Sequence, residues 1–197
     1  MAKPINNGKD ILLLLLYSPG VTEETNEPIQ GRTRLTKLLF LFGQELLEHF
    51  RSGTSITREN FYEFFPWDFG PFSKEVYDDL LFFTLRGFIE SAPSSEGDAL
   101  PEEAAEWEKW TEANDSATSE EENEFQEEQF RLSPKGVEFT RGLYDQLGDA
   151  QKKLLREFKA RMSKVSLRAL LQYVYTNYPD QVVKSKIREN VLGHYMV

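Results

Sequence analysis

Apolar residues along the first half of the chain form two clusters that predict helices. Residues 11–17 are a continuous apolar run stopped at Pro19, and they predict a short buried helix. In residues 33–50 apolar side chains recur every three or four positions, which predicts a longer helix with Thr33 as its N-cap residue. Phe40 and Leu41 widen the apolar arc of this second helix, so we expect it to be buried on more than one side.

The middle of the chain predicts a turn, a third helix and a β-hairpin. Residues 69–73 read Phe-Gly-Pro-Phe-Ser, and Ser73 is placed to cap a helix that runs through Arg86 and ends at Gly87. Residues 88–90 and 130–132 are short apolar segments that can pair as antiparallel strands. Residues 91–129 would then form the very long tip of this hairpin.

The rest of the chain predicts helices with a basic surface. Pro134 suits the first turn of a helix that reaches about residue 147. Further apolar stripes predict helices around residues 154–162, 166–176 and after Pro179. We therefore predict a mainly α fold, with a winged-helix-like core, an enlarged acidic wing and C-terminal helices. The expected division is residues 1–148, with an insertion at 91–129, and a basic helical part at 149–197 packed on it.

Charge is distributed very unevenly along the 197 residues. The net charge is −10, but residues 91–130 alone hold 14 acids and one base, a net −13. Residues 149–197 hold 4 acids and 10 bases, a net +6. The acidic segment is too polar to offset its chain entropy by burial, so most of it should be a mobile loop.

One part of the acidic segment has a helical pattern. Residues 101–113 are good helix formers, and Trp107 and Trp110 would lie on one face of such a helix. One interpretation is a solvated helix whose tryptophans rest on the parent domain. The other is an acidic-aromatic segment that docks on a partner.

The composition excludes several classes of site. The chain has no Cys and two His that are far apart, so neither a thiolate site nor a structural zinc cluster is expected. Sequence motifs for phosphate loops, dinucleotide binding and nucleophile elbows are absent, and we expect neither a cofactor nor enzymatic activity. No apolar run is long enough to span a membrane, and we expect a cytoplasmic protein.

Three motifs, in order, resemble a known family. Residues 31–40, GRTRLTKLLF, resemble the "L-x-K-L-L-Y/F" helix of the SocA-like (Panacea) antitoxin domain and its winged-helix relatives. Residues 69–80 are similar to the "G-P-x-x-x-x-[VL]-Y-x-x-L" stretch of that group, and residues 132–136 to the "L-T-x-x-G" that follows the wing in many winged-helix proteins. The acidic insertion departs from this pattern. The resemblance implies a winged-helix fold and a regulatory role through binding of a partner protein.

The first functional hypothesis is nucleic-acid binding. The predicted third helix is the one that a winged helix usually places in the major groove, but it carries more acids than bases, and the wing is acidic. Binding would therefore use basic residues of the second helix and of the C-terminal helices. These candidates are Arg32, Arg34, Lys37, Lys152, Lys153, Arg156 and Lys159. Alternatively, the same residues form a soluble surface or an internal dock for the acidic segment.

The second hypothesis is a protein-interaction module, as the antitoxin resemblance implies. One face of the third helix would place an aromatic residue among acids, which suits a basic or DNA-associated partner. The candidate contacts are Glu75, Asp78, Asp79, Phe82 and Arg86, with Trp107 and Trp110 of the acidic segment. The simpler alternative is that Phe82 belongs to the core. A third hypothesis, an enzyme using Glu63, Asp68 and Glu75, rests only on the proximity of these acids in the sequence.

Overall fold

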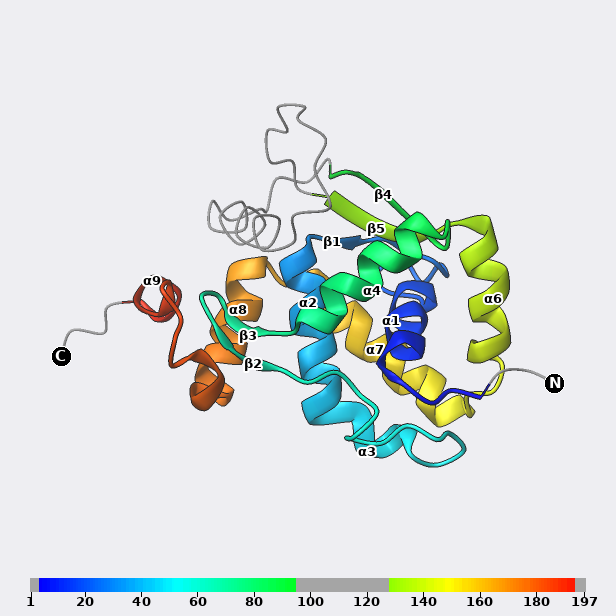
Figure 1. The fold of residues 1–197 in the computed structure, drawn as a ribbon, viewed down its shortest axis with the longest axis horizontal. Helices are drawn as coiled ribbons and strands as arrows, with labels where there is room; N and C mark the ends of the chain where they lie inside the picture. Colours follow the sequence, from blue (N-terminus) through cyan, green and yellow to red (C-terminus); the bar gives the residue numbers. More distant parts are fainter. Residues whose placement is uncertain (1–3, 95–127, 194–197) are drawn as a thin grey trace.

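The structure is a computed structural model that describes residues 4–94 and 128–193. These residues form a mainly α-helical protein with two small antiparallel sheets (Figure 1). The helices are α1 (Gly8–Tyr17), α2 (Arg32–Leu41), a π-helical turn (Phe42–Leu46), α3 (Leu47–Phe50), α4 (Lys74–Leu85), α6 (Pro134–Tyr144), α7 (Asp149–Lys164), α8 (Leu167–Asn177), a 3-10 turn (Pro179–Val182) and α9 (Arg188–Leu192). The strands are β1 (Ile29–Gln30), β2 (Phe65–Trp67), β3 (Gly70–Phe72), β4 (Ile89–Pro93) and β5 (Glu128–Leu132).

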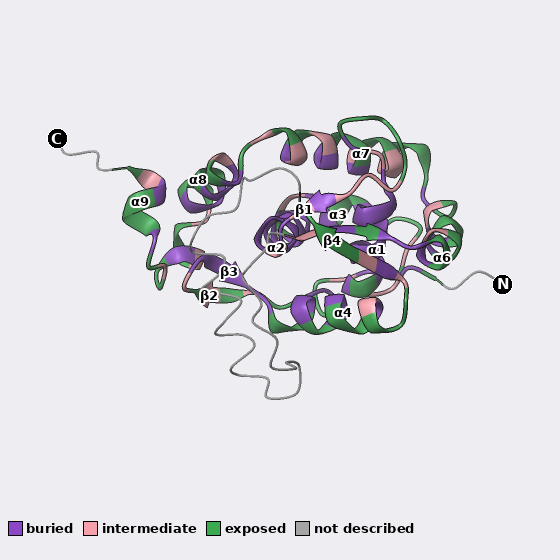
Figure 2. Ribbon diagram, turned by 90° about the horizontal axis from the view of Figure 1, so that it is seen from above, coloured by how far each residue is buried: buried purple, intermediate pink, exposed green. Residues whose placement is uncertain are grey.

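Helix α2 is the buried axis of the molecule. Every residue from 33 to 43 is buried, which confirms that this helix is covered on more than one side. In Figure 2, α4 and α7 lie on opposite sides of the molecule, with α1 and α2 between them. The predicted N-cap at Thr33 is wrong, because Gly31 occupies that position with a φ of 75° and turns the chain from β1 directly into the helix.

The predicted hairpin forms and is longer than expected. Strands β4 and β5 pair from Ile89 opposite Leu132 to Pro93 opposite Glu128, so the ends of the expected loop belong to the strands. The two-residue strand β1 adds to the other edge of β5, with Ile29 opposite Phe130. Residues 95–127, with Trp107, Trp110 and the predicted helix 101–113, lie outside the described residues.

A second, two-stranded sheet leads into α4. At the turn between β2 and β3, Gly70 has a φ of 87°, and a Cβ there would approach Tyr175 Cε1 to 3.0 Å. As predicted, α4 follows Ser73 and ends before Gly87, which has a φ of 69°. The predicted side-chain cap is wrong, because the Ser73 hydroxyl is fully buried and makes no hydrogen bond within the described residues.

The C-terminal helices share the core of the rest of the chain. As predicted, α6, α7 and α8 form, whereas the segment after Pro179 is a 3-10 turn followed by the short α9. Buried side chains such as Leu155, Phe158 and Val174 belong to the same hydrophobic cluster as α1 and α2. Within the described residues, 4–94 and 128–193, every helix is too short or too polar to cross a membrane.

Candidate interaction surface on helix α4

Helix α4 has one buried face and one exposed apolar face. Its buried face includes Val76, Leu80 and Phe83, which pack into the core. The opposite face, which we call the α4 surface, consists of exposed Lys74, Glu75, Asp78, Leu81, Phe82, Leu85 and Arg86. Leu85 is 77% exposed and Phe82 is 44% exposed, so the alternative that Phe82 is simply a core residue does not hold. The α4 surface therefore presents large apolar side chains to solvent.

Two cations hold the ring of Phe82 in place. Lys9 Nζ and Arg86 Cζ each lie 5.5 Å from the centroid of the Phe82 ring. Phe82 also packs edge-on against Phe83, with ring centroids 5.4 Å apart. Cations over an aromatic face are attracted by the ring quadrupole. The exposed ring is therefore positioned by contacts on α1 and α4, although much of it remains open to solvent.

The aromatic contacts continue from α4 to α6. Phe83 contacts Phe88 at 5.9 Å between centroids, and Phe88 contacts the exposed Phe139 of α6 at 5.5 Å. Lys135 Nζ lies 4.2 Å from the Phe88 ring centroid and donates a 2.8 Å hydrogen bond to the carbonyl oxygen of Arg86. The end of α4 is thereby tied to the start of α6.

Asp79 is an anchor of α4 and not an exposed acid. It is 6% exposed, accepts a 3.0 Å hydrogen bond from the Tyr62 hydroxyl and forms a 2.8 Å ion pair with Lys9. Burial, together with the Asp79 charge, raises the pKa of Tyr62 well above its ordinary value. The predicted role of Asp79 as a partner contact is therefore corrected, because its carboxylate is already occupied inside the protein.

A polar groove of about 410 Å³ lies beside the first turns of α4. Glu75 and Asp78 line one side, and Lys9 and Asn60 are among the residues that line the rest. The groove gives the acidic end of the α4 surface a recess that a polar side chain of a partner can enter.

Two of the three acids of the enzyme hypothesis, Asp68 and Glu75, use their carboxylates in structural contacts, whereas Glu63 is exposed and contributes its backbone N–H. The Asp68 carboxylate forms a 2.8 Å ion pair with Lys186, and Glu75 Oε2 accepts a 3.2 Å hydrogen bond from the backbone N–H of Glu63. Among the residues that the structure describes, no group of three His, Asp or Glu side chains could hold a metal ion.

Three of the predicted nucleic-acid contacts are buried, which corrects their assignment. Arg34 is 6% exposed, and its guanidinium donates hydrogen bonds of 2.9 and 2.8 Å to the carbonyl oxygens of Met162 and Val165. Lys37 is fully buried and donates a 3.0 Å hydrogen bond to the carbonyl oxygen of Pro71. Both side chains are buried and hydrogen-bonded to backbone carbonyl oxygens, so they cannot reach a phosphate.

Lys159 is the third buried cation. Its ammonium donates hydrogen bonds of 2.9, 2.8 and 2.7 Å to the carbonyl oxygens of Leu16, Ser18 and Glu27, and the residue is fully buried. Burial lowers the pKa of Lys159 to about 7, against the smaller opposing effect of the Glu27 charge. Lys159 is therefore part of the core, and its predicted contact with nucleic acid is wrong for the same reason.

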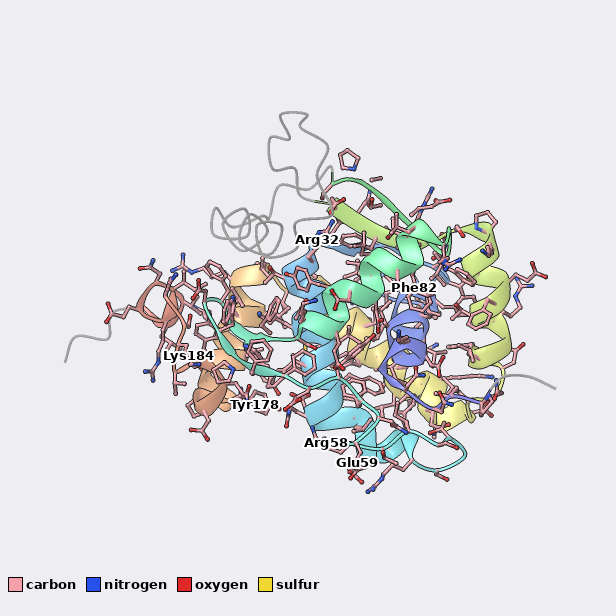
Figure 3. The ribbon with its side chains drawn as sticks, in the orientation of Figure 1. Arg32, Arg58, Glu59, Phe82, Tyr178 and Lys184 are labelled. Atoms are coloured by element: carbon pink, nitrogen blue, oxygen red, sulfur yellow. The ribbon has the colours of Figure 1, made fainter. Side chains whose placement is uncertain are left out.

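The remaining predicted basic residues lie in two different places. Arg32, which is labelled in Figure 3, is half-buried beside β5. It forms an ion pair with Glu128, and its Cζ lies 5.4 Å from the centroid of the Phe130 ring. Lys152, Lys153 and Arg156 lie in the first turns of α7, on the side of the molecule away from α4 (Figure 2). The structure therefore does not bring the seven predicted residues together.

Sequence reasoning missed several exposed apolar residues. Leu81 and Leu85 had no predicted role, although together with Phe82 they form a second stripe on α4, at helical spacing. Phe65 and Trp67, each 40% exposed, form another aromatic patch on the outer side of β2. Such residues can be found from the sequence only by asking which apolar positions remain after one buried stripe is assigned.

Comparison of the chain with family models, with curated proteins and with solved structures found no match in any of the three. The function is therefore argued from the geometry of the molecule itself.

Proposed function

We propose that this chain is a non-enzymatic regulatory module, similar to the SocA-like antitoxins, that binds a partner protein through the α4 surface. The observation that carries the proposal is the exposure of Leu81, Phe82 and Leu85 on one face of one helix. Contiguous exposed apolar side chains bordered by polar ones are typical of protein interaction sites. Charged Asp78 and Arg86 border this apolar centre, as in the polar rim of an interface.

We also assign the core to the winged-helix class. The order of helices α2 and α4 followed by hairpin β4–β5, and the sheet order β1-β5-β4, support this assignment. In a winged helix, α4 would be the helix that reads DNA. Here its outward face carries three apolar side chains, two acids and two bases, and one of the bases, Lys74, is paired with Asp78. This composition favours a protein surface over a phosphate backbone.

The competing function, nucleic-acid binding, loses much of its support. DNA affinity depends largely on cations that neutralise phosphates. Of the seven candidates, Arg34, Lys37 and Lys159 are buried, and Arg32 is ion-paired with Glu128. A nucleic-acid-binding protein that its own acidic segment inhibits would have to rely on Lys152, Lys153 and Arg156 of α7. The proposed module needs none of these residues to be free.

Leu85→Glu tests the proposal, because it places a charge in the apolar centre of the α4 surface at a highly exposed position. We expect the variant to fold normally and to lose a partner that wild-type protein captures from the host, with affinity reduced at least about tenfold. The matched control is Val183→Glu, an equally drastic change at a residue that is 64% exposed elsewhere. Capture followed by mass spectrometry, and titration of the purified partner, give the measurement.

Two results would contradict the proposed function. One is a partner that binds Leu85→Glu and wild type equally well. The other is tight, sequence-selective binding of duplex DNA by the intact protein at physiological salt, which would favour the nucleic-acid alternative.

A further inference from the structure

The α4 surface carries opposite charges at equal distances on the two sides of Phe82. Asp78 lies four residues before Phe82 and Arg86 lies four residues after it, so the three side chains follow one stripe of the helix. All three residues are exposed. An acid therefore stands one turn to the N-terminal side of the ring, and a base stands one turn to the C-terminal side.

From this pattern we propose that the α4 surface pairs with the α4 surface of a second copy of this chain, antiparallel about a twofold axis at Phe82. In an isologous contact each side-chain pair occurs twice, so Asp78 of each copy would oppose Arg86 of the other. The stripe follows an i, i+4 row, and rows of this kind from two helices pack side by side in the commonest class of helix pair. The inference rests on the proposed use of the α4 surface for binding.

The contacts inside one molecule leave Asp78 and Arg86 able to form ion pairs with a second copy. Arg86 contacts the ring of Phe82, and no carboxylate of the described residues pairs with it. Asp78 forms a 2.9 Å pair with Lys74, with the two side chains 48% and 57% exposed. Such an exposed pair contributes little and is readily replaced. The second copy would thus supply Arg86 with a carboxylate and Asp78 with a further cation.

The apolar side chains give this pairing its driving force. Leu81 and Leu85 flank the stripe and would lose solvent contact in the dimer together with the exposed side of Phe82. A contact limited to one helix from each copy is small for a stable interface. We therefore expect a monomer–dimer equilibrium with a dissociation constant roughly in the micromolar range.

Charge reversal and charge exchange test the pairing in the full chain. Asp78→Arg and Arg86→Asp should each weaken dimerisation about tenfold or more, because each single change places like charges together at two symmetric points. The double variant, which exchanges the two charges, should recover most of the wild-type dimerisation. Glu157→Arg, a charge reversal on α7 at a side chain that is 57% exposed, should leave the equilibrium unchanged. Sedimentation velocity over a concentration series measures each constant, and circular dichroism melts check the fold.

The outcomes separate this inference from the proposed function. A wild-type protein that stays monomeric at every concentration overturns the dimer, as do single variants that dimerise normally or a double variant that stays monomeric while folded. If Leu85→Glu loses the host partner but wild type is monomeric, only the dimer is wrong. If wild type dimerises with the expected charge dependence but Leu85→Glu keeps the host partner, only the proposed function is wrong.

Discussion

The buried cations of α2 and α7 and the exposed cations around α4 have opposite surroundings. Lys159 is enclosed by three carbonyl oxygens, whereas Lys135 lies over the Phe88 ring and reaches a single carbonyl at the surface. Similarly, Arg34 binds two carbonyls inside, while Arg86 lies over an exposed ring. The difference shows that each of these positive side chains either binds several carbonyl oxygens in the core or lies over an aromatic ring at the surface.

The acceptors of two buried cations are free because they lie at helix ends. The last carbonyl groups of a helix have no partner within the helix, and positive charge is favourable there. Lys159 binds carbonyls at the end of α1, and Arg34 binds carbonyls at the end of α7. Each of these two cations thus caps a helix to which it does not belong. The exposed Lys135 also caps the end of α4, but with a single hydrogen bond at the surface, to the carbonyl oxygen of Arg86.

The sharpest test of this comparison is to reverse one charge in each region. Lys159→Glu would place a carboxylate against three carbonyl oxygens in the core, and we expect a loss of about 4 kcal/mol or more in the free energy of unfolding. Lys135→Glu at the surface should cost about 1 kcal/mol, because it removes only the contact with the Phe88 ring and one hydrogen bond. Urea denaturation measures both. A Lys159→Glu protein with near wild-type stability would show that the site opens to water.

Two glycines of α6 test whether crowded and open backbone positions also differ in their effect on stability. A Cβ at Gly136 would lie 2.1 Å from the carbonyl oxygen of Phe88, whereas a Cβ at Gly142 meets no atom within 4 Å. We expect Gly136→Ala to cost about 1–3 kcal/mol and Gly142→Ala to stabilise the protein by about 0.5–1 kcal/mol. Thermal melts of the two variants give the answer. Equal effects would mean that α6 can shift away from β4.

Titration of Lys159 should make the free energy of unfolding depend on pH, with an effect per pH unit smaller than that of the charge reversal at Lys159. The ordinary pKa of lysine is 10.5 and that of Lys159 is about 7, so between these values the unfolded chain binds a proton that the folded protein releases. The free energy of unfolding should therefore rise with pH across this window, by up to about 1.4 kcal/mol per unit. It should fall back as the pH drops towards 7, where the folded protein must bury the charge.

Denaturation between about pH 7 and about pH 9 measures this slope. Lys159→Met should remove the contribution, and Lys135→Met, a matched change at an exposed lysine, should retain it. If the wild type and Lys159→Met have the same slope, Lys159 keeps its proton throughout this range.

Local patterns predicted most of the helices, since apolar spacing and turn residues act within a few positions. Gly87 ends α4 and Pro134 opens α6 as expected. The two-residue β1 was missed because its partner lies about a hundred residues away, beyond the reach of any local pattern. Burial of Lys159 was missed because charge was taken as a sign of exposure. Its spacing from Leu155 and Met162 places it on the buried stripe of α7, and that signal was available.

The candidate site could be predicted only in part. Asp78, Phe82 and Arg86 were placed on one exposed helix face from their spacing, and they do lie there. The occupied state of Asp79 depends on Tyr62 and Lys9, which come from separate segments, so nothing in the local sequence of α4 reveals it. The exposure of Leu85 likewise depends on which other segments pack against the last turn of α4, and the local sequence does not reveal this.

The Lys159 hydrogen bonds also have a consequence for synthesis on the ribosome. The bond from Lys159 to the Leu16 carbonyl joins residues 143 positions apart in the chain. The first helix therefore emerges long before the side chain that completes its C-terminal end exists. At roughly 5–20 residues per second, this interval lasts on the order of ten seconds. During that time these carbonyls lack the ammonium of Lys159, so we expect the nascent chain to acquire its final fold only after Lys159 has emerged from the ribosome.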